Sequence, residues 1–328
     1  MTITVQAPPL ANRSARDELL VTMNRLMGRF RRVGWLLGEG RSGTTWLASL
    51  VDADRRSRHV FEPFHPKRTP ELSDLMVPYL YVRPGTRQPL LERIMERVFT
   101  GRLHSPRTAS SHRRLLYDGL LVKDIFANLL VPWVHQQLPD VRKVLLLRHP
   151  VAVARSKLQL DDWYWAREPA DLLKQDELME DHLSPFDGVL ASGSSQLQKY
   201  VVMWCVSTLV PLRAFRPGEL HVVFYENLRH HLERDLAPLL DYLGRPPPSP
   251  DALARVVGRP SRTSRLEGGR ALVAPTDPAQ GIDPVEFRRA MNSLDAFGLT
   301  GLYGGSPEPD PSVAAGLLAH DFTRAAQR

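Results

Sequence analysis

The chain has 328 residues, of which 43% are hydrophobic and 24% are charged. This composition is typical of a globular protein with one large or two small domains, and it excludes fibrous and fully disordered chains. No run approaches the roughly 20 apolar residues that span a bilayer, and the N-terminus lacks the pattern of a secretory signal. The single cysteine, Cys205, excludes an intramolecular disulfide and a cysteine-rich zinc site, which favours a cytoplasmic location.

The net charge is +7, which favours an anionic partner: nucleic acid, anionic lipid or a small phosphorylated ligand. A nucleic-acid-binding module would need a basic patch interleaved with aromatic residues. The arginines are instead scattered along the chain, so this alternative is the weaker one. A surplus of arginine on a solvated surface is the simplest explanation of the charge.

Hydrophobic periodicity predicts an N-terminal extension over residues 1–32, with a helix from residue 14, and then alternating strands and helices. Strands are predicted over 33–38, 59–63, 120–125, 141–150 and 219–228, and helices over 44–53, 151–160, 195–215, 230–244 and 285–296. Such alternation predicts one α/β domain over 33–328, with a P-loop-like central parallel sheet flanked by helices. Residues 67–118 and 161–193 are expected to be excursions from this domain, and 306–312 a surface loop.

The first predicted strand runs directly into the glycine-rich sequence GEGRSGTTWL. A strand, a glycine-rich loop and a helix N-terminus point backbone N–H groups at one spot, which suits a phosphate. Gly38, Gly43 and Thr45 fit the nucleotide-triphosphate pattern GxxxxGK[ST], but Thr44 replaces its lysine. This loss argues against a P-loop kinase, which is kept as an alternative, and Arg41 supplies a cation inside the loop instead.

The loop resembles the 5′-phosphosulfate loop of sulfotransferases that use 3′-phosphoadenosine 5′-phosphosulfate (PAPS). The segment LLLRHPVAVARSKL, residues 145–158, is similar to the 3′-phosphate segment of that family, with Arg148, Pro150 and Ser156 at the matching positions. The family more often has Asp or Asn where His149 stands. Arg148 would offer a planar, permanently charged fork to a phosphate.

Further matches extend the resemblance over most of residues 33–230. HVFEP resembles a Glu-Pro segment of carbohydrate and tyrosylprotein sulfotransferases, and LLVKDI resembles the Lys-Asp strand of the tyrosylprotein enzymes. The segment 246–328 corresponds to a C-terminal part that returns a polar loop to the cofactor, here RPSRTSR. The resemblance implies a bacterial PAPS-dependent sulfotransferase that releases 3′,5′-adenosine bisphosphate (PAP). The expected donor-binding residues are Gly40, Arg41, Ser42, Gly43, Thr44, Thr45, Arg148, Ser156, Ser261 and Ser264.

Sulfuryl transfer to a hydroxyl needs a base for the acceptor proton and cations for the departing phosphate. Glu62 is the expected base, because it ends a strand at the edge where α/β sheets bind ligands. Arg41 and Lys123 are the expected cations. Each of two residues has a structural alternative: Glu62 as the partner of a nearby arginine, and Lys123 as the partner of Asp124 or of a surface acid. His65 is an alternative base.

The stripe Trp163-Tyr164-Trp165 fits two roles equally: stacking on an acceptor or anchoring its own loop. No HExxH motif or carboxylate cluster occurs, so no metal is predicted. The acceptor is expected to be a small metabolite, a glycan or a lipid head group. The sequence does not identify it, nor the oligomeric state.

Overall fold

The computed structural model describes residues 15–75, 77–103, 114–160, 163–258, 266–267, 270–271, 277–303 and 307–319. Its centre is a five-stranded sheet with strand order β2-β3-β1-β4-β5, and all neighbouring strands are parallel. The strands are β1 (Val33–Gly38), β2 (Ser57–Phe61), β3 (Gly119–Lys123), β4 (Arg142–Leu147) and β5 (Leu220–Phe224). This confirms the expected α/β fold with a central parallel sheet flanked by helices.

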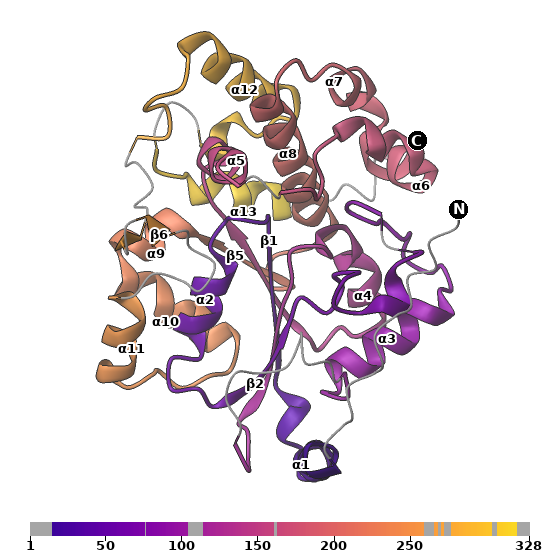
Figure 1. The fold of residues 1–328 in the computed structure, drawn as a ribbon, viewed down its shortest axis with the longest axis vertical. Helices are drawn as coiled ribbons and strands as arrows, with labels where there is room; N and C mark the ends of the chain where they lie inside the picture. Colours follow the sequence, from indigo (N-terminus) through magenta and orange to yellow (C-terminus); the bar gives the residue numbers. More distant parts are fainter. Residues whose placement is uncertain are drawn as a thin grey trace.

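Alternate residues of the strands enter two separate apolar cores, one on each face of the sheet. Leu36 of β1 packs with α2 (Thr44–Val51) and α10 (Leu232–Tyr242), whereas Trp35 and Leu37 pack on the opposite face. That opposite face is covered by α3 (Pro89–Phe99), α4 (Val131–Gln137) and α8 (Gln196–Ala214). The two groups of helices lie on either side of the strands in Figure 1. Burial on both faces explains why the strands read as continuous apolar runs.

The remaining helices surround this framework. Helix α8 contacts α5 (Pro150–Leu158), α12 (Pro284–Ala296) and α13 (Pro311–Ala319). Helix α11 (Pro250–Val257) contacts α2, and α9 (Tyr225–His230) contacts α10. Helix α1 (Ala15–Leu26) precedes β1 at the lower end of Figure 1. The other elements are α6 (Asp176–Leu178), α7 (Asp187–Ala191) and the short antiparallel pair β6 (Leu266–Glu267) and β7 (Arg270–Ala271).

Some predicted boundaries are wrong, and they differ mostly at the carboxyl ends of strands. The strand predicted over 219–228 ends at Phe224, and residues 225–230 form helix α9. The strand predicted over 120–125 ends at Lys123, because the Asp124 carboxylate accepts backbone N–H groups and turns the chain. The loop expected over 306–312 gives way to α13 at Pro311, which is favoured at a first helical position.

The register brings the ends of all five strands to one edge. Phe61, Lys123 and Leu36 are aligned across β2, β3 and β1, and Gly38 aligns with Leu146 of β4. The residues that follow these strands therefore meet at the carboxyl edge, where open α/β sheets bind their ligands. Whether residues 1–32 form a separate extension from 33–328 stays a prediction.

Candidate functional site

The loop between β1 and α2 is held in shape largely by its own polar groups. The Ser42 backbone N–H and hydroxyl both donate to the Glu39 carbonyl, at 3.0 and 2.6 Å. Arg41 and Gly43 have positive φ angles of 76° and 99°. Ser42 is fully buried, and both its N–H and its hydroxyl are engaged within the loop, so this residue shapes the loop and its contact with a ligand stays a prediction.

Two glycines of the loop are required by close neighbours. A Cβ at Gly43 would lie 2.8 Å from the Tyr225 ring, and a Cβ at Gly40 would lie 2.3 Å from the Trp163 ring. The bare backbone thus accommodates aromatic rings on two sides. The indole of Trp163 packs on the loop, which favours the anchoring role over the stacking role for this residue.

The two predicted phosphate-binding motifs meet in space. The Arg41 Nε donates to the Ser156 hydroxyl at 3.0 Å, and the Arg148 guanidinium donates to the Arg41 carbonyl at 3.0 Å. The Arg148 guanidinium also lies 4.6 Å from the centre of the Tyr225 ring. These contacts join α5 and the end of β4 to the loop after β1.

The charge balance at this junction favours an anion. Burial and the like charge of Arg148 together lower the pKa of Arg41 from its usual value. Two guanidinium groups held this near each other are stabilised by a negative ligand between or beside them. The junction of Arg41, Arg148 and Ser156 is therefore suited to a phosphorylated compound.

The structure describes only some of the other expected donor-binding residues. Thr44 is buried, and Thr45 is half-buried in the first turn of α2. Ser261 and Ser264 lie outside the described residues. The roles of all these residues stay predictions.

Glu62 follows β2 and lies between two cations. Its Oε1 is 2.6 Å from the Lys123 Nζ and its Oε2 is 3.1 Å from the Arg68 Nε. Its backbone N–H donates to the Lys123 carbonyl at 2.6 Å and its φ is 47°, so the residue is fixed at the sheet edge. The sequence pointed to Glu62 and Lys123 separately and left open a pair of Glu62 with a nearby arginine, but it did not indicate that this arginine is Arg68. Glu62 and Arg68 are six positions apart across a turn, and such a spacing does not by itself indicate a contact.

Asp124 is a structural residue, and it does not hold Lys123. Its carboxylate accepts hydrogen bonds from the backbone N–H groups of Phe64, Phe126 and Ala127, at 3.0, 2.6 and 3.1 Å. Burial raises the pKa of Asp124 to about 7. Lys123 is paired with Glu62 instead, and its role in catalysis stays a prediction.

His65 has both ring nitrogens engaged. The Lys67 backbone N–H donates to its Nδ1 at 3.1 Å, so in the neutral ring Nε2 carries the proton and donates to the Tyr164 hydroxyl at 3.2 Å. Burial lowers the pKa of His65 to about 4. An imidazole whose lone pair already accepts a backbone hydrogen bond is poorly placed to take a proton from an acceptor.

The stripe of residues 163–165 connects this region to the loop. Tyr164 is 50% exposed and carries the Lys67 ammonium 3.9 Å above its ring, whereas Trp165 is buried against Phe126. Of the three aromatic residues, Tyr164 is thus the one presented to solvent, and the two tryptophans anchor the segment.

Glu39 was missed by sequence reasoning. Its carboxylate is buried in the loop and forms an ion pair with Lys157, and it accepts hydrogen bonds from Tyr79 and Ser207. An acidic residue inside an anion-binding loop was the available signal, because such a charge requires a buried cation nearby.

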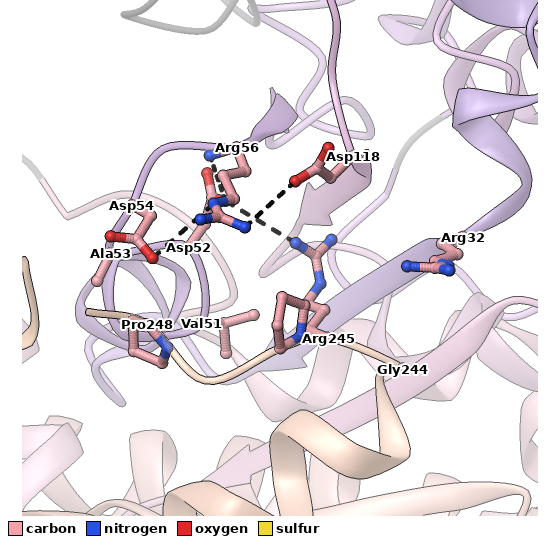
Figure 2. Close-up of a pocket in the computed structure, with 11 residues that line it drawn as sticks. Arg32, Val51, Asp52, Ala53, Asp54, Arg56, Asp118, Gly244, Arg245 and Pro248 are labelled. Atoms are coloured by element: carbon pink, nitrogen blue, oxygen red, sulfur yellow. Dashed lines mark hydrogen bonds and ion pairs between the residues drawn. The ribbon is translucent and has the colours of Figure 1, made fainter.

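A small cavity lies at the opposite, amino edge of the sheet (Figure 2). Its volume is about 30 Å³, and ion pairs lie along its wall. Arg56 pairs with both Asp54 and Asp118, whereas Arg245 pairs with Asp52. That space holds water but not a nucleotide. The cavity is therefore separate from the candidate site.

The described residues provide neither a metal-binding cluster nor a membrane-spanning helix. They contain no group of three or more His, Cys, Asp or Glu side chains arranged to hold a metal ion. Within the same part of the chain, no helix is both long and apolar enough to cross a membrane.

Solved structures similar to this chain include a sulfotransferase domain from the curacin biosynthetic pathway, a sulfotransferase from Alicyclobacillus acidocaldarius and a mouse sulfotransferase complexed with PAP. The curacin domain is 14% identical with a TM-score of 0.42, covering 81% of this chain and 97% of its own. The bacterial enzyme is 14% identical with a TM-score of 0.39, covering 90% and 98%. The mouse enzyme is 12% identical with a TM-score of 0.42, covering 95% and 94%.

A search of curated proteins gave no match. A family model described as the sulfotransferase family matches residues 35–249, which include both predicted phosphate-binding motifs, Glu62 and Lys123. This match covers well over half of the chain. The chain belongs to the sulfotransferase family.

Proposed function

We propose that this sulfotransferase transfers the sulfuryl group of PAPS to a hydroxyl of a sugar, a lipid head group or a small metabolite. The observation that carries the proposal is the junction of Arg41, Ser156 and Arg148. It joins two anion-binding segments that come from adjacent central strands. A ligand with phosphate groups at both ends of one nucleoside matches such a paired arrangement.

The donor set fits this ligand by its chemistry. Backbone N–H groups of the loop and the N-terminus of α2 suit the 5′-phosphosulfate, and Arg41 adds a cation there. Arg148 and Ser156 offer a charged fork and a hydroxyl to the 3′-phosphate. PAPS supplies the activated sulfuryl group when it is bound.

Glu62 is the proposed base, which accepts the proton of the acceptor hydroxyl at one of its carboxylate oxygens. Each of those oxygens keeps a further lone pair beside its ion pair with Lys123 or Arg68. Lys123, which touches Glu62, and Arg41 are the proposed cations that stabilise negative charge as it develops on the departing phosphate. The reaction is proposed to be metal-independent and in-line, and a cytoplasmic location stays part of the proposal.

Nucleotide titration tests the donor. Calorimetric titration with PAP, AMP, ATP and a short duplex DNA is expected to give tight binding of PAP alone. Tight binding of ATP with Mg²⁺ would support the kinase alternative, and tight binding of DNA the nucleic-acid module.

The acceptor is tested by incubation with isotopically labelled PAPS and pools of metabolites, glycans and lipids. Mass spectrometry is expected to find one class of compound carrying an added sulfate. Sulfate transfer that stays absent from every pool, together with no binding of PAP, would contradict the proposal.

A further inference from the structure

A buried ion pair lies directly beneath the candidate donor site. The Glu39 carboxylate contacts the Lys157 ammonium, and the two side chains are 3% and 0% exposed. Burial lowers the pKa of Lys157, and the charge of Glu39 opposes that effect. A pair this deep is a weak source of stability, because removing both charges from water costs about as much as their attraction returns. Its position therefore suggests a role beyond stability.

The carboxylate is fully satisfied by groups from distant segments. Besides Lys157 of α5, it accepts hydrogen bonds from the Tyr79 hydroxyl and from the Ser207 hydroxyl of α8, the latter at 2.8 Å. Tyr79 has a φ of 52°, and its side chain is fully buried. Three separate stretches of the chain thus converge on one residue of the loop.

A second contact joins the same two segments, the loop after β1 and helix α5. Lys157 follows Ser156, and Ser156 accepts the hydrogen bond from Arg41, which lies two residues after Glu39. Consecutive residues of α5 therefore bind two residues of the loop. One contact lies in the candidate donor site and the other lies beneath it.

The charges also matter for an anionic ligand. A carboxylate within the loop repels a phosphosulfate unless a cation neutralises it, and Lys157 provides that cation in a region of low dielectric.

We infer that Glu39 and Lys157 are positioning residues, which fix helix α5 against the loop so that both ends of the bisphosphorylated nucleotide are bound at once. This inference rests on the proposed function. Without the pair, the 5′ and 3′ phosphate-binding segments are expected to lose their fixed separation, and the contribution of the 3′-phosphate to affinity falls.

The test compares Glu39→Gln, Lys157→Met and the double variant by calorimetric titration with PAP and AMP, with thermal unfolding recorded for each. Lys157→Met leaves an uncompensated carboxylate, so PAP affinity is expected to fall about tenfold or more, further than in Glu39→Gln. The double variant is charge-neutral and is expected to fold. Its ratio of AMP to PAP dissociation constants is expected to fall about fivefold or more, because misplacing α5 removes part of the roughly 10- to 150-fold that a charged contact to the 3′-phosphate contributes.

A matched control is the Lys199–Glu168 pair, which spans α8 and the 163–193 segment and is partly exposed. Lys199→Met, Glu168→Gln and their double variant are expected to leave both dissociation constants unchanged. A surface pair contributes little, and this one does not touch the loop.

The double variant decides the question even where Lys157→Met fails to fold. An unchanged ratio of dissociation constants in the double variant would overturn the inference and leave the pair a purely structural feature. Wild-type protein that binds PAP no better than AMP would overturn the proposed function as well, so the two failures are distinguishable.

Discussion

The Nε of Arg41 lies 3.0 Å from the Oγ of Ser156, across 115 residues of sequence. This contact joins the glycine-rich loop after β1 to the helix after β4, which are adjacent central strands. It is the direct structural link between the two motifs on which the proposal of a doubly phosphorylated ligand rests. The predictions below follow from this site and its surroundings.

Arg148→Ala is expected to abolish the preference for the 3′-phosphate. A hydrogen bond to a charged group contributes about 1.5–3 kcal/mol, so PAP is expected to bind about 10- to 150-fold more weakly while AMP is little affected. Titration with both nucleotides measures this. Arg234→Ala is the control, because Arg234 is 61% exposed and paired with Asp235 on α10. A variant that discriminates PAP from AMP as wild type does would contradict the assignment of Arg148.

Glu62→Gln is expected to lower kcat strongly while leaving PAP affinity nearly unchanged. A positioned base contributes about 10²- to 10⁴-fold, and glutamine keeps the shape of the side chain without taking the proton. His65→Gln is expected to reduce kcat far less, since Nδ1 already accepts the Lys67 N–H. Steady-state kinetics of both variants decides between them. The reverse ranking would make His65 the base and Glu62 a partner for Lys123 and Arg68.

Activity is expected to be insensitive to EDTA and to added Mg²⁺. Thr44 stands where a triphosphate-binding loop has its lysine, and PAPS has no triphosphate for Mg²⁺ to bridge. Transfer rates measured with EDTA and then with excess Mg²⁺ test this. Activity that is lost in EDTA and returns with Mg²⁺ would contradict the proposed mechanism.

Gly43→Ala is expected to reduce both stability and PAP affinity. The φ of 99° is unfavourable for alanine by about 1–2 kcal/mol, and the added Cβ would meet the Tyr225 ring at 2.8 Å. Thermal unfolding and PAP titration measure the two effects. Gly244→Ala separates them, because Gly244 has a φ of 62° with no atom within 4 Å of the added Cβ. Equal losses of stability in the two variants would show that Tyr225 moves aside without cost.

Stability is expected to fall as the pH drops from about 6.5 to 4, in part because of His149. Burial lowers the pKa of His149 to about 4, so in this window the unfolded chain binds a proton that the folded chain does not. The free energy of unfolding then falls by up to about 1.4 kcal/mol per pH unit for this group. His149 Nδ1 accepts the Val151 N–H at the start of α5, and asparagine preserves such a cap.

His149→Asn is therefore expected to flatten the pH dependence without losing the helix. Urea unfolding at pH 7 and at pH 5 measures the difference between the variant and the wild type. His230→Asn, at an exposed position on α9, is the control. An unchanged slope in His149→Asn would show that other groups carry the acid sensitivity.

Sequence reasoning found those parts of the site that are continuous motifs or that belong to a recognisable strand. The loop after β1 and the segment around Arg148 are continuous motifs, so a parallel sheet brings them together once the strands are recognised. Glu62 was found because it comes at the end of a predicted strand, and Lys123 because its strand resembles the Lys-Asp strand of the tyrosylprotein enzymes. The register aligns Phe61 with Lys123 and so brings both to one edge.

The contacts that were missed join residues whose separation carries no pattern. Glu39 and Lys157 are 118 positions apart, and only the packing of α5 on the sheet brings them together. Trp163 occupies the space left by Gly40, but a glycine in such a loop is expected whether or not a ring covers it. The boundary at Lys123 was misplaced because the turn after β3 depends on hydrogen bonds to the Asp124 side chain rather than on hydrophobicity. The boundary at Phe224 was misplaced because helix α9 begins directly at Tyr225, with no turn residue between the strand and the helix.

The strand order places the proposed donor-binding residues and the proposed base on different kinds of strand. The proposed donor-binding residues follow β1 and β4, which occupy interior positions of the sheet, whereas Glu62 follows β2, an edge strand with one neighbour. An interior pair tolerates little change, while an edge strand and the segment after it can vary without disturbing the rest. Exchanging β2 and the segment after it for those of a relative would then change which acceptor hydroxyl is recognised and preserve nucleotide binding.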